Sequence, residues 1–305
     1  MTELSIIILN YNTPDLTINC LKSIVEASRG LGDIEVIVVD NGSGDGSVKQ
    51  LKNLKIKNQN DRLKIKIIES GENRGFAGGN NYGLKDAGGK YVLFLNSDTI
   101  LKPEALRVAL DKIKSIPRIG AITANTVLAN GKMDPDCHRG FPTPWASLTY
   151  FLGFERLFPN TKLFGQYHQG FLDLTADHEV PAGAGAFMLI PKTVINQVGT
   201  WDDNYFFYGE DLDFFYRIHN AGYKVVYIAK PLLTHFKGAS SGLRRESKGV
   251  STKANRVKVA KASIQAMEIF YKKFYVDKYP SWLTQFILLG IKVKGLTRII
   301  YHYLK

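Results

Sequence analysis

Polar, glycine-rich clusters recur among the apolar runs in the first hundred residues of this chain. They are Asn10-Tyr11-Asn12 after LSIIIL, DNGSGDGS (40–47) after IEVIVV, GENRGFAGGNNYG (71–83) before the third predicted helix, and Asn96-Ser97-Asp98 after YVLFL. In an open α/β sheet, ligands bind just outside the carboxyl ends of the strands. One such cluster is equally well explained as ordinary turn chemistry, but four at one sheet edge predict a binding site.

The residue types in these clusters suit a ligand that carries a diphosphate. Asp40 can accept hydrogen bonds from a base or a ribose, Arg74 can bind phosphate, and the glycines allow close approach of the backbone. The first strand is followed by NYNTPD rather than by the glycine pattern of a dinucleotide-binding fold, and the chain has no Walker A lysine pattern. The sequence therefore disfavours a dehydrogenase and a P-loop enzyme.

A second group of chemistry-bearing side chains lies in GEDLDFFYR (209–217). On a helix, Asp211 and Asp213 are two positions apart and point about 160° away from each other, so they cannot share a role. Asp213 and Arg217 are four positions apart, which predicts an ion pair. Glu210 and Asp211 are either proton-transfer groups or carboxylates placed favourably at a helix N-terminus.

Two further residues have both a structural and a functional interpretation. Trp201 either stacks on an acceptor sugar ring or fills the core. His235 opens HFKGASSG (235–242) after a predicted strand, and is either a structural histidine or a metal ligand.

Alternating strands and helices must position these side chains. Strands are predicted at 4–9, 34–39, 63–68, 91–95 and 120–123, with helices at 14–27, 46–52, 76–87 and 103–116. This order, with nearly continuous apolar strands, predicts a mostly parallel sheet covered by helices on both faces. Residues 125–180 contain prolines and aromatic residues without a period, which predicts an irregular insertion. Strands at 185–191 and 223–228 and helices at 209–221, 253–275 and 281–303 complete the expected elements.

The composition fits a globular domain with a positively charged C-terminal region. Of the 305 residues, 45 % are hydrophobic. The two cysteines without paired spacing argue against a disulfide framework and favour a reducing cytoplasm. No secretory signal pattern is found at the N-terminus. Residues 237–305 contain 15 Lys and Arg against 3 Asp and Glu, which accounts for the whole net charge of +12.

The last predicted helix is amphipathic. Its apolar residues at 286, 289, 293, 296, 300 and 303 share one face, and Lys292, Lys294 and Arg298 interrupt the stretch. Because a spanning helix needs a longer uncharged run, this segment is not expected to cross a bilayer. It either lies on an anionic membrane surface, or packs on the domain or against a second copy.

The motifs LSIIILNYN, VVDNGSGDGS, NRGFAGGNNYG, FLNSD and FFYGEDLDFFYR resemble, in order and spacing, those of glycosyltransferase family two. The resemblance covers roughly residues 3–241 and is strongest to a bacterial rhamnosyltransferase-like and galactofuranosyltransferase-like branch. It implies a GT-A (Rossmann-like) α/β fold with a C-terminal helical extension. It also implies a nucleoside-diphosphate sugar donor and transfer with inversion.

The same resemblance implies roles for individual residues. Asp211 resembles the general base, with Glu210 binding acceptor beside it. From its residue type alone, Trp201 is a further candidate acceptor contact. Asp98 stands at the acidic position of the metal-binding motif, and His235 resembles a second ligand to Mn²⁺ or Mg²⁺. The expected contacts to the donor are Asn10, Tyr11, Asn12, Asp40, Arg74, Gly75, Asn81, Asn96 and Ser97.

The resulting expectation is a catalytic domain at 1–241, with 125–180 as an acceptor-side insertion, and a basic helical extension at 242–305. The predicted enzyme transfers a sugar, rhamnose by resemblance, to a lipid-linked glycan in cell-wall or surface polysaccharide assembly. It would be cytoplasmic and peripheral on the inner face of the membrane. The alternatives are a sugar-nucleotide nucleotidyltransferase and a non-catalytic sugar-nucleotide-binding protein. A nucleic-acid partner would rest on the basic tail alone and is not expected.

Overall fold

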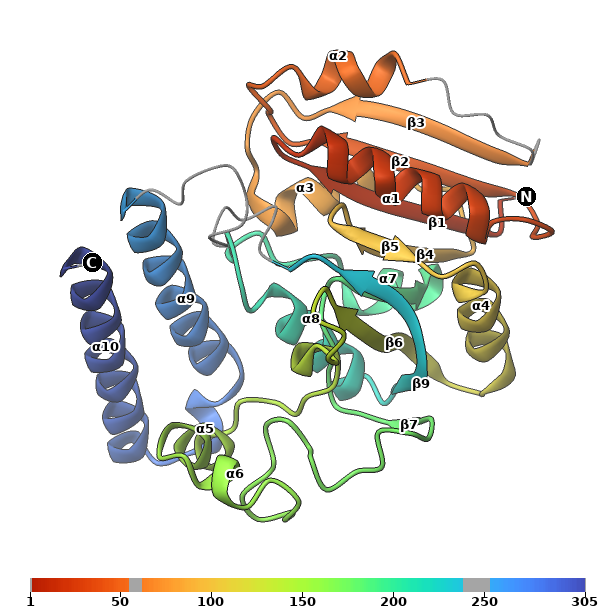
Figure 1. Cartoon of the computed structure of the whole chain (residues 1–305). Helices are drawn as coiled ribbons and strands as arrows, with labels where there is room; N and C mark the ends of the chain where they lie inside the picture. The colour runs from red at the N-terminus through yellow and green to blue at the C-terminus, as the bar shows by residue number, and fades with distance from the viewer. Residues whose placement is uncertain (1, 55–61, 238–252, 305) are drawn as a thin grey trace.

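The computed structural model describes residues 2–54, 62–237 and 253–304 (Figure 1). Within them, one sheet has the strand order β3-β2-β1-β4-β8-β6-β9-β5, and β7 pairs with β9. The strands are β1 (Leu4–Asn10), β2 (Ile34–Asp40), β3 (Leu63–Glu69), β4 (Tyr91–Asn96), β5 (Thr99–Leu101), β6 (Ile119–Leu128), β7 (His178–Glu179), β8 (Phe187–Pro191) and β9 (Lys224–His235).

The first half of the sheet is parallel and the second half is mixed. β1 pairs in parallel with β2 and β4, and β2 with β3, whereas β8 runs antiparallel to β4 and β6. The parallel register sets Asn10 opposite Asp40 and Leu9 opposite Asn96. The polar clusters that follow these strands therefore meet at one edge of the sheet, as predicted.

Helices cover both faces of the sheet, so that it has two hydrophobic cores (Figure 1). One core is closed by α1 (Pro14–Ala27), α2 (Ser47–Lys52) and α4 (Ala105–Ser115), and the other by α3 (Gly75–Leu84), α7 (Lys192–Val198) and α8 (Glu210–Asn220). Along β1, Leu4, Ile6 and Ile8 enter the first core and Ile7 the second. Alternation of this kind explains why the strands are apolar at nearly every position.

Some expected boundaries differ from the structure. β6 extends to Leu128 and β9 to His235, beyond the predicted ends at 123 and 228, because each strand continues past a register irregularity into a second paired stretch. β5 and α7 were not predicted, since both are short. The expected insertion at 125–180 contains only short helices, α5 (Pro144–Phe151), α6 (Phe154–Leu157) and a 3₁₀ turn at Pro135–Cys137, together with the two residues of β7.

The C-terminal helices α9 (Lys253–Phe274) and α10 (Ser281–Leu304) form a hairpin beside the sheet domain (Figure 1), with a 3₁₀ turn at Val276–Lys278 between them. Phe270 and Tyr271 of α9 enter the second core, where Phe270 packs edge-on against Tyr216 of α8. Among the described residues, no helix is both long enough and apolar enough to cross a membrane.

Candidate active site

The end of β9 brings His235 beside Asp98. β5 pairs antiparallel with β9 in a register that sets Thr99 opposite His235, and the Phe236 N–H donates to the Asp98 carbonyl oxygen at 2.8 Å. As a result, Asp98 Oδ1 lies 3.2 Å from His235 Nε2, and both side chains are buried. Asn96 Nδ2 lies 3.5 Å from the same ring nitrogen.

Asp134, which follows β6, contacts the other side of the imidazole ring. Its Oδ2 lies 3.4 Å from His235 Nδ1. Burial by itself would lower the pKa of His235, but the hydrogen bonds with Asp134 and Asp98 outweigh it and raise the pKa to about 9. A carboxylate at Nδ1 fixes the orientation of the ring, so that Nε2 stays directed at Asp98.

Asp98 and His235 fit two neighbouring ligands of a divalent cation. Adjacent corners of an octahedron with metal–ligand bonds of about 2.1 Å lie about 3 Å apart, which is close to the Asp98–His235 separation. No group of three or more His, Cys, Asp or Glu residues in the described parts of the chain is arranged to hold a metal. Asp98 and His235 would thus supply two of the ligands.

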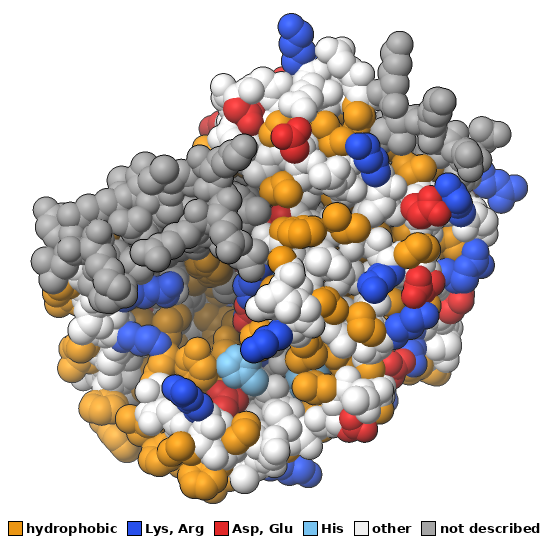
Figure 2. Space-filling view, viewed as in Figure 1, with side chains coloured by type: hydrophobic (Ala, Val, Ile, Leu, Met, Phe, Trp, Pro, Cys, Tyr) orange, Lys and Arg blue, Asp and Glu red, His pale blue; other side chains and the backbone are white. Residues whose placement is uncertain are grey.

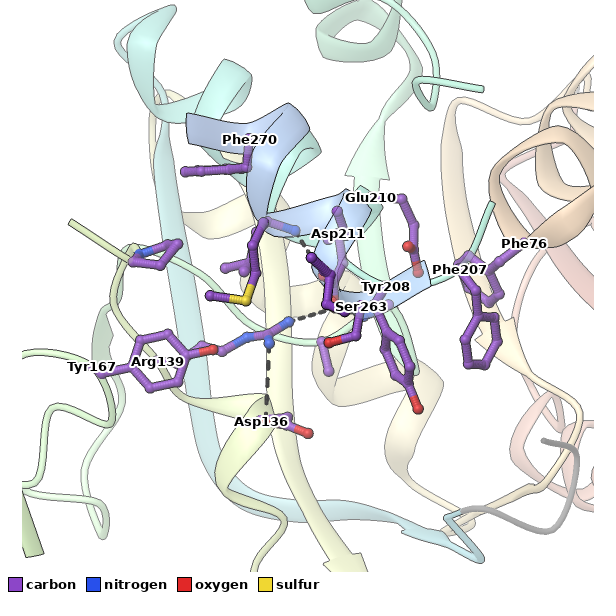
Figure 3. Close-up of a pocket in the computed structure, with 18 of the residues that line it drawn as sticks. Phe76, Asp136, Arg139, Tyr167, Phe207, Tyr208, Glu210, Asp211, Ser263 and Phe270 are labelled. Carbon is purple, nitrogen blue, oxygen red and sulfur yellow. Dashed lines mark hydrogen bonds and ion pairs between the residues drawn. The ribbon is translucent and has the colours of Figure 1, made fainter. Parts of the chain in front are cut away.

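The second part of the site is the ion pair between Asp211 and Arg139 (Figure 3). Asp211 Oδ2 accepts from Arg139 Nη2 at 2.5 Å and from the Gly185 N–H at 3.2 Å. Arg139 also donates to the Gly183 carbonyl oxygen from Nε at 3.0 Å and from Nη2 at 2.9 Å. Burial opposes the charge of Arg139, but Asp211, Tyr167 and Asp136 raise its pKa, so the guanidinium stays charged. The backbone before β8 and the arginine together fix the Asp211 carboxylate.

Glu210 is the first residue of α8 and lies on the side of Asp211 away from Arg139 (Figure 3). Its side chain is buried, and Oε2 has no hydrogen-bond partner among the residues that the structure describes. Burial, with the charge of Asp211 next, raises the pKa of Glu210 from 4.5 to about 8. The site thus combines a carboxylate held by an arginine with a neighbouring carboxyl group that is mostly protonated at neutral pH. Such a difference between neighbours is typical of acid–base sites.

Asp136 connects the two parts of the site. It lies 3.9 Å from Arg139 Nη1 and forms an ion pair with Lys237, which also binds Asp134 Oδ1 at 2.8 Å. A continuous row of opposite charges therefore runs from His235 to Asp211. Asp134, Asp136 and Arg139 were not predicted as site residues, because they lie in the stretch without a hydrophobic period. The one available signal was the density of charge in DPDCHR (134–139).

These side chains line one pocket of about 740 Å³. Its lining includes five of the residues that were predicted from the sequence, namely Asn96, Asp98, Glu210, Asp211 and His235. Other parts of the wall come from α5, which lies in the predicted acceptor-side insertion, and from the α9–α10 hairpin, which the sequence did not place at the site. Figure 2 shows this side of the molecule hollowed, with hydrophobic side chains gathered at its lower left, over α5 and α6.

The residues predicted to bind the nucleotide lie next to this pocket, at the ends of β1 and β2. Asn10 Nδ2 donates to Asp40 Oδ2 at 2.8 Å, and Asp40 Oδ1 accepts from the Ser43 N–H at 2.9 Å. The N–H of Asn12, whose φ is +55°, donates to Ser43 Oγ at 2.9 Å. Tyr11 is exposed and Ser97 is buried. The structure brings the loops after β1 and β2 together. Their contact with a nucleotide base stays a prediction.

Three of the predicted donor contacts have structural roles of their own. Arg74 is half-exposed and pairs with Glu72 at 2.9 Å. Gly75 has φ +71°, and a Cβ there would lie 2.6 Å from the Phe206 carbonyl oxygen. Asn81 Nδ2 donates to the Trp201 carbonyl oxygen at 2.8 Å, while its Oδ1 accepts from the Trp201 N–H at 3.0 Å. Asn81 therefore joins α3 to the loop before α8. Because the nitrogen and the oxygen of its side-chain amide are already hydrogen-bonded, little hydrogen-bonding capacity remains for a sugar nucleotide.

Trp201 does not stand on the pocket surface. Its side chain is 2 % exposed, and its ring packs edge-on against Phe76, Phe94 and Phe214. A ring enclosed in this way cannot stack on an acceptor sugar, so the predicted acceptor contact is replaced by a core role. The expected ion pair is confirmed, with Arg217 Nε 2.7 Å from Asp213 Oδ1, and the Asp213 side chain is buried. Asp213 also pairs with Lys273 of α9.

Comparison with known families agrees with the geometry. The model of glycosyl transferase family 2 matches residues 5–172, more than half of the chain, and that of glycosyl transferase family group 2 matches residues 91–256. This chain belongs to glycosyl transferase family 2.

Two curated relatives of this family 2 chain are poly-β-1,6-N-acetyl-D-glucosamine synthases. The protein from Staphylococcus aureus (strain COL) is 28 % identical over 193 residues, which are 63 % of this chain and 40 % of the relative. The one from Staphylococcus epidermidis is 24 % identical over 229 residues, or 75 % of this chain and 48 % of the relative. The chain thus spans less than half the length of these relatives.

Solved structures confirm the GT-A fold of this family 2 chain. GalNAc-T7 with UDP, GalNAc and Mn²⁺ superposes with a TM-score of 0.57 at 16 % identity, over 89 % of this chain and 50 % of that one. Residues 1–349 of S. aureus TarS superpose with a TM-score of 0.53 at 15 % identity, over 96 % and 81 %. The same protein with UDP-GlcNAc gives 0.52 at 16 % identity, over 86 % and 66 %.

Proposed function

We propose that this chain is an inverting, metal-dependent glycosyltransferase that moves a sugar from a nucleoside diphosphate to an acceptor hydroxyl. One observation carries the proposal. A single pocket contains both the Asp98–His235 pair, which suits a metal and a diphosphate, and the Asp211 carboxylate fixed by Arg139. The Asp98–His235 pair would bind the leaving diphosphate through the metal, and Asp211 would activate the acceptor hydroxyl, which is the nucleophile. The pocket therefore has the space and the chemical groups for both substrates.

Asp211 takes the acceptor proton in this mechanism. As the acceptor oxygen forms its bond to the anomeric carbon, the bond from that carbon to the diphosphate breaks, and the hydroxyl proton passes to Asp211. Attack from the side opposite the leaving group inverts the anomeric configuration. Arg139 orients the carboxylate but also pairs with it, so the acceptor must approach the face of Asp211 that Arg139 leaves open. Glu210, protonated at neutral pH, can donate a hydrogen bond to an acceptor oxygen.

The donor is a nucleoside-diphosphate sugar placed at the ends of β1, β2 and β4. A divalent cation on Asp98 and His235, with manganese favoured by the imidazole ligand, would neutralise the developing charge of the leaving diphosphate. Lys237 lies beside His235 and supplies further positive charge. UDP-sugars are the first donors to test, because UDP or UDP-GlcNAc is bound in two of the similar structures.

The acceptor is a lipid-linked glycan at an anionic membrane surface. Six large apolar side chains of α10 are exposed: Trp282, Phe286, Leu289, Val293, Leu296 and Ile300. They lie on one helical face, in the part of the chain that carries the net positive charge, and this combination suits an anionic bilayer. A role in surface polysaccharide assembly agrees with the polymer made by the synthase relatives.

Asp211→Asn tests the assignment directly. Sugar transfer from UDP-, dTDP- and GDP-sugars to a lipid-linked acceptor is measured with and without manganese, alongside nucleotide binding by thermal shift. The variant is expected to lose at least about 100-fold in transfer rate, the lower range for removal of a general base, while its nucleotide-induced stabilisation is kept. Product anomeric configuration by NMR reports inversion.

Asp203→Asn, an acidic residue outside the pocket lining, is the matched control. Half of the wild-type rate in Asp211→Asn would reject the base assignment. Release of pyrophosphate from a nucleoside triphosphate and sugar phosphate, with no glycoside formed, would instead identify a nucleotidyltransferase. Nucleotide binding without either reaction would point to the non-catalytic class.

A further inference from the structure

The face of α10 that is turned toward the pocket carries two cations. Ile291, Lys294, Gly295 and Arg298 line the pocket at helical spacings of three and four residues. At 100° per residue, this face is roughly opposite the exposed apolar face of the same helix. A Cβ at Gly295 would collide with the Ile264 side chain of α9, so this glycine lets the two helices cross closely.

The two cations have no acidic partner among the described residues. Arg298 Nη1 donates to Ser263 Oγ of α9 at 3.1 Å, and the Lys294 ammonium lies over the Phe151 ring of α5. These contacts hold the cations in place but do not neutralise them. Burial, followed by the charge of Arg298, lowers the pKa of Lys294 to about 8. A bound anion would relieve that repulsion.

The surroundings of the pair are apolar. Besides Phe151 and Ile291, the same wall contains Ile264, Met267 and Phe270 of α9. Positive charges framed by apolar side chains suit an amphiphile whose anionic group adjoins a hydrocarbon chain. A free sugar would bind poorly to this part of the pocket, because a sugar has neither a charge for the two cations nor a hydrocarbon chain for the apolar side chains.

The position of the pair separates it from the donor site. Ser263, which binds Arg298, lies beside Asp211 in Figure 3, on the base side of the pocket. The metal pair has its own cation in Lys237. Lys294 and Arg298 therefore stand where an acceptor would present its hydroxyl to Asp211.

We propose that Lys294 and Arg298 bind the phosphate or diphosphate of a lipid-linked acceptor, and so select acceptors that carry one. This inference rests on the proposed function and names the substrate class of its acceptor side. The apolar wall of α9 and α5 receives the first part of the lipid chain, and the sugar beyond the phosphate reaches Asp211.

The test uses the full chain with Lys294→Gln and Arg298→Gln combined, and Lys292→Gln on another face of α10 as the matched control. Binding of undecyl diphosphate, of uncharged undecyl maltoside and of UDP with manganese is measured by calorimetry. Because it loses two charge-assisted hydrogen bonds to the anion, the double variant should bind undecyl diphosphate at least about 100-fold more weakly. Its affinity for UDP and for undecyl maltoside should stay within about twofold of wild type.

Each alternative outcome overturns the inference in a distinct way. Unchanged binding of undecyl diphosphate would show that the pair does not contact the anion. If the affinity for UDP fell as well, Lys294 and Arg298 would bind the phosphates of the sugar-nucleotide donor instead. If the affinity for undecyl maltoside fell as well, the substitutions would have disrupted the apolar wall of the pocket. A wild-type protein that binds UDP with manganese but no alkyl diphosphate would overturn this inference alone, whereas one that binds no nucleotide sugar would overturn the proposed function.

Discussion

At the scale of single residues, two neighbouring carboxyl groups at the start of α8 differ because their environments differ. Asp211 faces a guanidinium and a backbone N–H, whereas Glu210 Oε2 is buried without a partner. The sequence indicated that both were candidates for acid–base chemistry. It could not show which one meets a cation, because Arg139 lies 72 residues away in the chain.

Glu210 makes the stability of the fold depend on pH. Its pKa is raised in the folded chain, so the folded state binds its proton more tightly than the unfolded state does. Its contribution is fully present below pH 4.5 and is lost as the pH rises toward about 8. Glu210→Gln removes this dependence. Between pH 5.5 and 7.5, the variant should gain stability relative to wild type by about 1 kcal/mol per pH unit.

Urea unfolding at several pH values measures this difference. Glu69→Gln, at an exposed position of β3, serves as the control for removing one carboxylate. A difference between Glu210→Gln and wild type that stays flat with pH would mean that Glu210 is charged in the folded state.

At the scale of elements, the parallel first half of the sheet could be predicted from the sequence. The contacts that hold the loops in place at the site could not. Apolar runs with polar ends identify β1, β2 and β4, because buried parallel strands need apolar side chains on both faces. The extension of β9 to His235 depends on pairing with β5 and β6, which no local pattern encodes. Asn81 and Trp201 were assigned to ligands for the same reason: their partners lie 120 residues apart in sequence.

Gly75 shows how tightly α3 docks against the loop before α8. Gly75→Ala forces a non-glycine residue into a left-handed conformation, at about 1–2 kcal/mol, and pushes its Cβ into the Phe206 carbonyl oxygen. The free energy of unfolding should therefore fall by more than about 2 kcal/mol. Gly44→Ala is the control, since a Cβ there meets nothing within 4 Å. Equal stability of the two variants in urea titrations would contradict this view of the docking.

At the scale of the whole molecule, the C-terminal hairpin joins two surfaces that the sequence treated as alternatives. The residue pattern in 281–303 allowed either a membrane-binding helix or one packed on the domain or against a second copy. In the structure, one face of α10 lines the pocket while the opposite apolar face is exposed. The apolar positions 286, 289, 293, 296 and 300 share one exposed face, and no pattern in the tail sequence indicated that the other face would reach the site.

Removing part of the exposed face should release the protein from membranes. Phe286→Gln with Leu289→Gln is expected to reduce partitioning onto vesicles containing phosphatidylserine by at least about tenfold, since each buried CH₂ contributes about 0.8 kcal/mol. Ile100→Ser, an exposed apolar residue of β5, is the control. Sedimentation with vesicles measures the effect, and unaltered partitioning of the double variant would argue against membrane binding through α10.

The pairing of β5 with β9 has a consequence for how the candidate metal site responds to heat. Asp98 and His235 are held by hydrogen bonds of the sheet backbone, since the Phe236 N–H binds the Asp98 carbonyl oxygen and Thr99 is in register with His235. The backbone positions that carry the two side chains can separate only if the strand pair opens. The two ligands should therefore keep their spacing up to the melting transition and lose it within that transition, whereas the helical wall opposite can loosen earlier. On warming, the proposed enzyme would lose its selectivity between acceptors at a lower temperature than the one at which it releases the proposed metal.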